Sequence, residues 1–219
     1  MWLVVAVLAS LHIISIRYGP KWLFYISKPL PLLLMITILI TSEATHLAYT
    51  RWILSGLSLS LFGDVLLMLP RNKSLLGFSA FCLAHLSYCF SFALISAWHI
   101  TPWLPVAVFG LGGCIYLFLR PGMGNQKLAV AIYIVVVMAM SWMALEYYFS
   151  GQTQSSSFAI LGCLLFVISG MVLGFGRVDG QSVFSRQVVM VTYYSAQTLI
   201  TMSVIAIVIR TSYLAFINA

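Results

Sequence analysis

Asp64 is the residue whose type and position most strongly suggest chemistry, because it places a carboxylate within the hydrophobic run GDVLLMLP. A carboxyl group can give or take a proton and so serve as a general acid or base. A charged side chain at bilayer depth costs at least ~2.5 kcal/mol to insert, so an acid there indicates a functional site with a partner nearby. The first question is therefore which residue pairs with Asp64.

Lys28 is the partner that the sequence favours. It lies in the motif SKPLP, where two prolines interrupt an apolar segment. Proline removes an amide donor and disfavours helical geometry in the residue before it, so we expect the backbone to bend at Lys28. Two alternatives are that Lys28 extends to the lipid headgroups, and that Lys28 and Asp64 form an ion pair that only fixes helix packing. Because buried ion pairs usually add little net stability, we favour a functional pair.

Polar residues of two later segments are expected at the depth of Lys28 and Asp64. They are Ser169 in the seventh segment and Tyr193, Tyr194 and Gln197 in the eighth. Each is consistent with an ordinary interhelical hydrogen bond. Their common depth instead favours a polar pocket that opens toward the cytoplasm.

His85 lies near the middle of the fourth segment and shares a helical face with Cys82 and Cys89. Three ligands on one straight helix point too nearly parallel to complete a tetrahedral metal site, and the sequence offers no evident fourth ligand. We therefore predict no metal here, and we expect His85 to make a hydrogen bond to another helix.

The elements that position these residues are predicted to be membrane helices. Of the 219 residues, 62% are hydrophobic and 7% are charged, and the mean hydropathy is +1.06. Membrane spans are helices or closed barrels, and continuous apolar runs lack the alternation of barrel strands. The sequence thus predicts an all-α, polytopic integral membrane bundle of eight transmembrane helices, forming a single transmembrane domain over residues 1–219. The segments are 2–16, 23–41, 52–69, 75–98, 103–119, 128–149, 156–176 and 187–209.

The basic residues predict the orientation of these helices. Most of the eleven Lys and Arg residues follow odd-numbered segments, which by the positive-inside rule places those connections in the cytoplasm and the chain N-out and C-out. No basic residue precedes the first segment, so we expect a retained anchor and not a secretory signal. Anionic lipid headgroups explain the net charge of +7 without nucleic acid. The orienting residues are Arg17, Lys21, Arg71, Lys73, Arg120, Lys127, Arg177 and Arg186.

Five motifs occur in order along the chain. They are SKP at 27–29, GDVLLML at 63–69, FSAFCLAHLSY at 78–88, FVIS at 166–169 and YYSAQ at 193–197. Together they resemble the YhhN-type lysoplasmalogenase family of integral membrane proteins, and most closely its enterobacterial branch. The resemblance runs over residues 28–200, which is nearly the whole chain.

The resemblance implies a membrane hydrolase of the bacterial inner membrane that cleaves the vinyl ether bond of a lysoplasmalogen. The products are a fatty aldehyde and glycerophosphoethanolamine or glycerophosphocholine, and neither a metal nor an organic cofactor is expected. The expected partners are the lysophospholipid substrate and membrane lipids. Vinyl ether hydrolysis needs an acid to protonate the β-carbon and a water molecule to capture the oxocarbenium ion.

The expected site residues are of two kinds, catalytic residues and residues that contact the substrate. We expect Asp64 as the principal catalytic carboxylate, positioned by Lys28, with His85 as a further catalytic residue. The residues expected to contact the substrate are Ser169, Tyr193, Tyr194 and Gln197. The sequence leaves open whether Asp64 acts as an acid or as a water-activating base.

Gly170 departs from the family pattern. In much of the family the Ser of the seventh segment is followed by Asp, which supplies a second carboxylate, whereas this chain has Gly170. Asp179 lies roughly 13 Å further along a helix and is a poor substitute, so His85 or Tyr193 is the alternative second group. The substitution Gly170→Asp is predicted to raise hydrolysis, because two close carboxylates share a proton.

The second hypothesis is a non-catalytic lipid or small-molecule binding or transport protein that uses the same pocket. Transporters often carry interrupted helices at matching positions of two halves. All seven prolines here precede the sixth segment. The broken second segment therefore has no proline counterpart in the second half, which favours the hydrolase.

Overall fold

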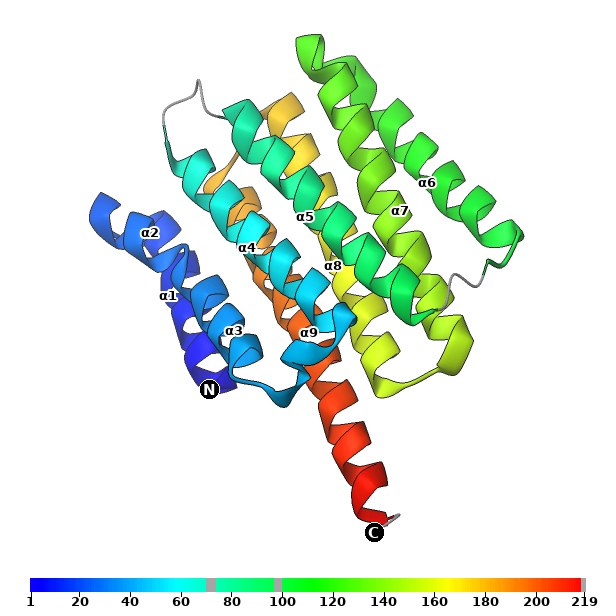
Figure 1. The fold of residues 1–219 in the computed structure, drawn as a ribbon. Helices are drawn as coiled ribbons and strands as arrows, with labels where there is room; N and C mark the ends of the chain where they lie inside the picture. The colour runs from blue at the N-terminus through cyan, green and yellow to red at the C-terminus, as the bar shows by residue number, and fades with distance from the viewer. Residues whose placement is uncertain (70–73, 97–99, 218–219) are drawn as a thin grey trace.

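The computed structural model describes residues 1–69, 74–96 and 100–217, without the side chains of residues 74, 125, 177–179 and 211–217. Within these ranges the chain is helical and contains no strand, in agreement with the predicted all-α class (Figure 1). The α-helices are α1 Trp2–Tyr18, α2 Lys21–Ser27, α3 Leu30–Ile40, α4 Ala48–Met68, α5 Ser74–Ile95, α6 Trp103–Leu119, α7 Lys127–Gly151, α8 Gln154–Asp179 and α9 Val183–Ile217. Short 3₁₀ turns η1 Glu43–His46, η3 Arg120–Gly122 and η4 Gly124–Gln126 complete the described elements.

The predicted break at Lys28 is confirmed. Helix α2 ends at Ser27 and α3 begins at Leu30, so Lys28 and Pro29 lie between two helices of one membrane span. Pro31 is the second residue of α3, a position where its missing amide hydrogen would have no intrahelical acceptor in any case. The two prolines thus end one helix and allow the next to begin.

Seven spans within the described ranges are long and apolar enough to cross a membrane, counting α2 and α3 as one. Helix α1 is apolar but only 17 residues long, so the count of eight crossings and the N-out, C-out orientation stay predictions. Figure 1 shows both termini at the same end of the bundle. The predicted segments agree with the observed helices to within a few residues, except that α9 continues to Ile217.

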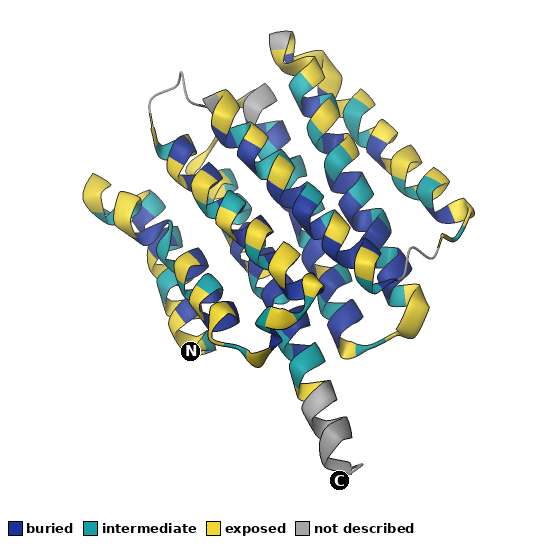
Figure 2. Ribbon diagram, viewed as in Figure 1, coloured by how far each residue is buried: buried dark blue, intermediate teal, exposed yellow. Residues whose placement is uncertain are grey.

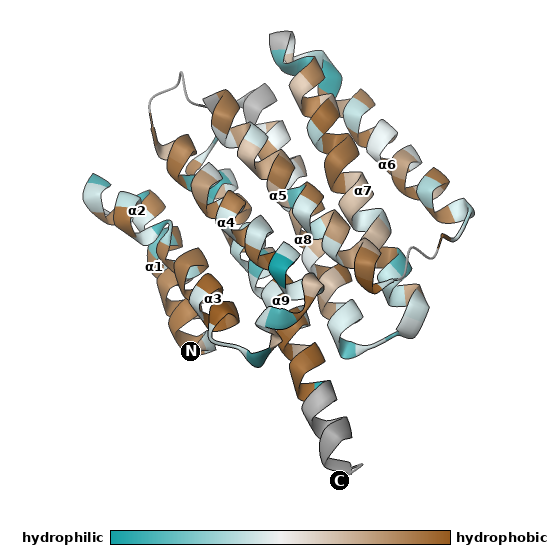
Figure 3. Ribbon diagram, in the orientation of Figure 1, coloured by the Kyte–Doolittle hydropathy of each residue, from teal (hydrophilic) through white to brown (hydrophobic). Residues whose placement is uncertain are grey.

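Helix α9 organises the packing, because it contacts α1, α3, α4 and α8. Helix α5 packs against α4 and α7, while α6 lies at the edge and packs mainly on α7 (Figure 1). Buried residues form stripes along the helices (Figure 2), whereas large apolar side chains such as Phe62, Leu83 and Val106 are exposed. Hydrophilic residues gather mainly at helix ends (Figure 3). An apolar outer surface of this kind is suited to lipid, and the polar residues buried inside the bundle then require their own explanation.

Candidate functional site

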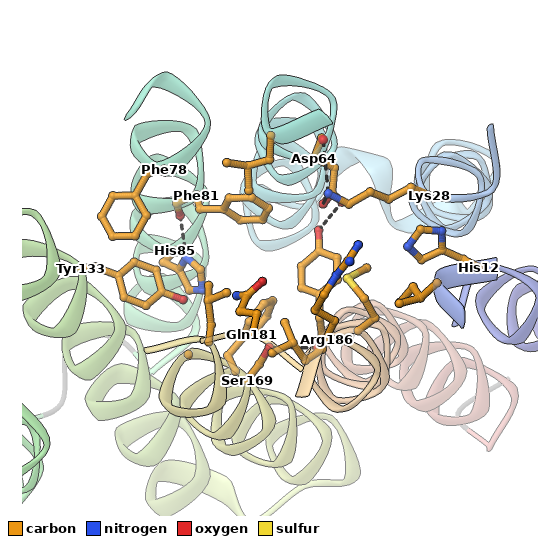
Figure 4. Close-up of a pocket in the computed structure, with 18 of the residues that line it drawn as sticks. His12, Lys28, Asp64, Phe78, Phe81, His85, Tyr133, Ser169, Gln181 and Arg186 are labelled. Atoms are coloured by element: carbon orange, nitrogen blue, oxygen red, sulfur yellow. Dashed lines mark hydrogen bonds and ion pairs between the residues drawn. The ribbon is translucent and has the colours of Figure 1, made fainter. Parts of the chain in front are cut away.

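A cavity of about 270 Å³ lies among α1, α2, α4, α5, α7, α8 and α9. Figure 4 shows His12 and Lys28 on one side of it and His85 with Tyr133 on the other. The exposed residues Gln181 and Arg186 belong to its wall, so it opens at the end of the bundle that carries the connection between α8 and α9. Its polar lining residues are His12, Lys28, Asp64, His85, Tyr133, Ser169, Gln181, Arg186 and Tyr193.

Asp64 is the centre of the polar cluster in this cavity. Its Oδ1 lies 3.1 Å from Lys28 Nζ, and its Oδ2 accepts a hydrogen bond of 2.8 Å from the Tyr193 hydroxyl. Asp64 is 2% exposed and Lys28 is 8% exposed. Lys28 therefore points into the bundle and does not extend to the headgroups, and both carboxylate oxygens have a donor.

The helix break holds Lys28 in place. Its ammonium group also donates to the backbone carbonyl of Asp64 at 3.4 Å, and its own carbonyl accepts a hydrogen bond of 2.9 Å from the Tyr194 hydroxyl. Carbonyls at a helix end have no intrahelical donor, so Tyr194 supplies the donor that the break removes. This contact fixes the backbone from which Lys28 reaches Asp64.

Close packing of α4 on α5 brings Asp64 to the cavity. A Cβ atom at Gly56 would lie 2.2 Å from the Tyr88 ring, and one at Gly63 would lie 2.9 Å from the Phe81 ring. Both positions must be glycine for the two helices to approach this closely. The sequence neighbour Gly63 thus determines how near Asp64 lies to α5.

His85 lies in the opposite wall with one ring nitrogen bonded and one not. Its Nδ1 is bonded to the carbonyl oxygen of Phe81, which can only accept, so Nδ1 carries the hydrogen and Nε2 is the basic nitrogen. Nε2 is buried and has no hydrogen-bond partner among the described residues. The expected bond to another helix was wrong, since Phe81 belongs to the same helix. His85 reaches α7 and α8 through ring contacts with Tyr133 at 5.4 Å and Phe166 at 4.8 Å.

The three other residues expected near the substrate lie at different positions. Ser169 lines the cavity and its hydroxyl donates to the carbonyl of Val189 at 3.1 Å. Tyr194 and Gln197 are not lining residues of this cavity. The Gln197 side-chain oxygen accepts a hydrogen bond of 2.7 Å from the Tyr88 hydroxyl, so Tyr194 and Gln197 support the wall from behind.

Sequence reasoning missed four polar residues of this cavity, which are His12, Tyr133, Gln181 and Arg186. His12 of α1 is fully buried, its Nδ1 lies 3.0 Å from the Ser27 hydroxyl oxygen, and its Nε2 has no partner among the described residues. Arg186 was counted only as an orienting charge, yet its side chain lies at the cavity rim, 5.8 Å from the Phe24 ring centre. An imidazole in an otherwise apolar segment was the signal that could have identified His12.

The donor set of this cavity does not favour a metal. Within the described ranges, no three His, Cys, Asp or Glu side chains come close enough together to hold a metal ion. Asp64 is the one carboxylate among the described lining residues, and Gly170 lies in the wall beside Tyr133. The side chain of Asp179, considered above as a second carboxylate, lies outside the described residues.

Known proteins match this chain over most of its length. The YhhN family model matches residues 23–204. The "Uncharacterized membrane protein YhhN" of Escherichia coli O157:H7 is 30% identical over 174 residues, covering 78% of this chain and 83% of that protein.

Two mammalian relatives carry an enzyme name. "Lysoplasmalogenase TMEM86A" of Bos taurus is 28% identical over 196 residues, covering 85% of this chain and 80% of that protein. "Lysoplasmalogenase TMEM86B" of Homo sapiens is 30% identical over 187 residues, covering 84% and 76%. No solved structure matches the chain. The motifs, the helical bundle and the match over residues 23–204 agree, and the chain belongs to the YhhN family of membrane proteins.

Proposed function

We propose that this chain is a lysoplasmalogenase-type membrane hydrolase, which converts a lysoplasmalogen and water into a fatty aldehyde and a glycerophospho-ethanolamine or -choline. The observation that carries the proposal is the Lys28–Asp64–Tyr193 cluster, a buried carboxylate that lines a cavity inside an apolar bundle. The relatives named lysoplasmalogenase support the same reaction. A single-chain lipid can bring its reacting bond into such a cavity while its chain stays in apolar surroundings.

One carboxyl group is sufficient for the proton transfers of this reaction. A proton adds to the β-carbon of the vinyl ether, water then attacks the oxocarbenium carbon, and that water loses a proton as the hemiacetal forms. Collapse of the hemiacetal gives the aldehyde and the alcohol, so the proton taken up in the first step is returned. Asp64 can deliver this proton and then recover it. General acid and base catalysis of this kind typically raises the reaction rate by about 10² to 10⁴-fold.

Lys28 and Tyr193 control where that proton lies. Both donate to the Asp64 oxygens in the structure, and such hydrogen bonds favour the carboxylate form after the proton has left. His85 presents a basic Nε2 with no described partner in the opposite wall. We assign to this nitrogen the role of orienting the attacking water.

Arg186 is suited to hold the phosphate of the substrate. It lies on the same face of α9 as Tyr193, two helical turns or about 10 Å nearer the rim, and it makes no ion pair with a described residue. Seven bonds separate the β-carbon of the vinyl ether from phosphorus, about 8 Å when extended. A guanidinium group binds phosphate oxygens well. In this proposal the headgroup lies at the rim, and the rim faces the cytoplasm at the bacterial inner membrane.

The test is product formation in deuterated water. Purified protein in lipid nanodiscs should release equal amounts of aldehyde and glycerophosphoethanolamine from lysoplasmenylethanolamine. Aldehyde trapped at once by reduction should carry one deuterium on the carbon next to the former carbonyl, because that carbon was protonated. Release without this deuterium would exclude carbon protonation, and no release would exclude the hydrolase.

A transport or binding protein is the second candidate. The broken α2–α3 helix contributes Lys28 to the cavity, and interrupted helices also form substrate sites in transporters. Uptake of an intact lysophospholipid analogue into proteoliposomes, with no aldehyde formed, would favour this function over hydrolysis.

A further inference from the structure

Gln197 is a buried polar residue that the proposed mechanism does not use. Gln197 and its partner Tyr88 are both fully buried, and neither lines the cavity of the candidate site. The Tyr88 hydroxyl donates to Gln197 Oε1 at 2.7 Å. Gln197 Nε2, the other end of the same amide, makes no hydrogen bond of ordinary length to a described residue. Because an unsatisfied buried N–H costs free energy, the direction in which this nitrogen points requires an explanation.

Tyr193 is the polar neighbour of this amide along α9. It lies four residues before Gln197, and residues four apart lie on the same face of a helix. The Gln197 side chain is close enough to the Tyr193 hydroxyl to act on it. Since Tyr88 already occupies Oε1, the N–H group is the end of the amide that is left for Tyr193. The oxygen of a tyrosine hydroxyl can accept a hydrogen bond while its hydrogen is donated elsewhere.

We propose that Gln197 is a positioning residue that directs the hydroxyl hydrogen of Tyr193 to Asp64. Its effect on turnover rests on the proposed function. Tyr88 holds the amide oxygen, so the amide N–H points at the Tyr193 oxygen. Tyr193 in turn donates to Asp64 Oδ2 at 2.8 Å. Every donor in this series points toward the carboxylate, and hydrogen bonds in series strengthen one another.

The opposite orientation of the Gln197 amide would weaken the site. With its oxygen turned toward Tyr193, Gln197 would offer a second acceptor for the hydrogen that Asp64 receives in the structure. The bond from Tyr88 opposes this orientation, because the Tyr88 hydroxyl donates to Oε1. Tyr88 therefore acts on Asp64 through two intervening side chains.

Tyr88 itself is fixed by packing against α4 and α8. A Cβ atom at Gly56 would lie 2.2 Å from the Tyr88 ring, so the ring lies directly on α4. On its other side the ring contacts Phe166 of α8, with 6.2 Å between the ring centres. A ring confined in this way keeps its hydroxyl oxygen beside Gln197, and the orientation of the amide follows from it.

Infrared spectroscopy tests the positioning without any substrate. The chain contains two aspartates, Asp64 and Asp179, so isotope labelling of aspartate carboxyl groups and subtraction of the Asp64→Asn spectrum isolate the Asp64 bands in nanodiscs. Tyr193→Phe should shift these bands, because it removes a donor. Tyr88→Phe and Gln197→Met should shift them in the same direction. Asp64 bands that stay unchanged in either of these last two variants would overturn the proposal.

Kinetics test the effect on hydrolysis. Tyr88→Phe removes only a hydroxyl group, and Gln197→Met removes the amide from a side chain of similar length. Each should lower kcat by about fivefold, the equivalent of one hydrogen bond, and leave KM unchanged, because neither residue lines the cavity. In a Tyr193→Phe background neither change should lower kcat further, since the hydroxyl that they direct is absent. A further loss of the same size in that background would contradict the proposal.

Tyr49→Phe is the matched control for Tyr88→Phe. Tyr49 is also a buried tyrosine of the bundle, and its hydroxyl is hydrogen-bonded to a side chain of α9, Ser203 Oγ, at 2.6 Å. Tyr49 does not line the cavity, so this variant should lose a similar amount of thermal stability and keep its kcat and its Asp64 bands. Equal losses of kcat in both tyrosine variants would make the effect of Tyr88 one of general packing and refute the positioning role. A protein that releases no aldehyde but shows the expected shifts of the Asp64 bands would refute the proposed hydrolysis and retain the positioning.

Discussion

Asp64 and Glu146 are both buried acids in an apolar bundle, yet their surroundings differ. Asp64 is 2% exposed and Glu146 is fully buried. Glu146 accepts hydrogen bonds from the Thr101 amide at 2.7 Å, the Thr101 hydroxyl at 2.9 Å and the Trp142 indole at 2.9 Å. Glu146 does not line the cavity of the candidate site, whereas Asp64 does.

The difference shows that burial of an acid is weaker support for a site than access to it. Thr101 precedes the first turn of α6, and an anion there is stabilised by amide donors and by the helix dipole. Glu146 thus fastens the start of α6 to α7. The Asp64 oxygens are in direct contact with Lys28 and Tyr193 in the wall of the cavity, where a substrate can replace or rearrange those contacts.

Asp64→Asn is expected to have the largest effect on hydrolysis. An amide can neither deliver nor recover the proton, so aldehyde release should fall by at least about 100-fold. The measurement is a coupled aldehyde assay on folded protein. Activity near that of the unmodified chain would remove Asp64 from the mechanism.

A double variant separates lost chemistry from lost stability. Removing one partner of a buried ion pair costs about 3 to 5 kcal/mol, because the other charge is left buried alone, whereas removing both is often neutral. Asp64→Asn with Lys28→Met should therefore regain thermal stability and remain inactive. Recovery of activity in the double variant would make the pair a packing element, like Glu146.

The depth at which each polar residue lies in the membrane was enough to predict some contacts of this site. The proline break and the common depth of Lys28 and Asp64 indicated a pair, and the structure brings them within 3.1 Å. The positions of the helices could also be predicted from the apolar runs, because a helix that crosses the bilayer needs an apolar segment of a certain length. The sequence therefore predicted the spans and the principal polar contact.

Rotation about each helix axis could not be predicted in the same way. Tyr193 and Tyr194 have the same depth but differ by about 100° around α9, and only Tyr193 lines the cavity. His12 was missed because it lies in the shortest predicted segment, 2–16, and comparing its depth in the membrane with that of other polar residues indicated no partner for it.

Tyr193→Phe is expected to have an intermediate effect. It removes the hydroxyl that donates to Asp64 Oδ2 at 2.8 Å, and a hydrogen bond to a charged group is worth about 1.5 kcal/mol or more, roughly a tenfold loss of kcat. Tyr194→Phe is its neighbour and control, because that hydroxyl donates to the Lys28 carbonyl. It should lower thermal stability more than turnover. Equal kinetic losses in both variants would argue against a specific role for Tyr193.

Gly170→Asp tests whether a second carboxylate in the cavity of the candidate site raises the rate of hydrolysis. The added side chain also meets Tyr133, so Gly170→Asn is needed as a control of nearly equal size. The rate of hydrolysis in Gly170→Asp should exceed the rates of both Gly170→Asn and the unmodified chain. Equal rates in the Asp and Asn variants would show that Asp64 needs no second carboxylate.

Glu146→Gln is expected to have the smallest effect on hydrolysis, and it makes the same carboxylate-to-amide change as Asp64→Asn. Hydrogen bonds to a charged acceptor are worth more than those to a neutral one, so weakening those from Thr101 and Trp142 should cost about 1 to 2 kcal/mol of stability. Turnover per folded molecule should stay within about twofold, because Glu146 does not line the cavity of the candidate site. Thermal melting and the aldehyde assay on the same preparation measure both quantities. A large loss of turnover without a loss of stability would mean that the end of the bundle that carries Glu146 also takes part in the reaction, since the lost interactions with Thr101 and Trp142 would then act on kcat and not on folding.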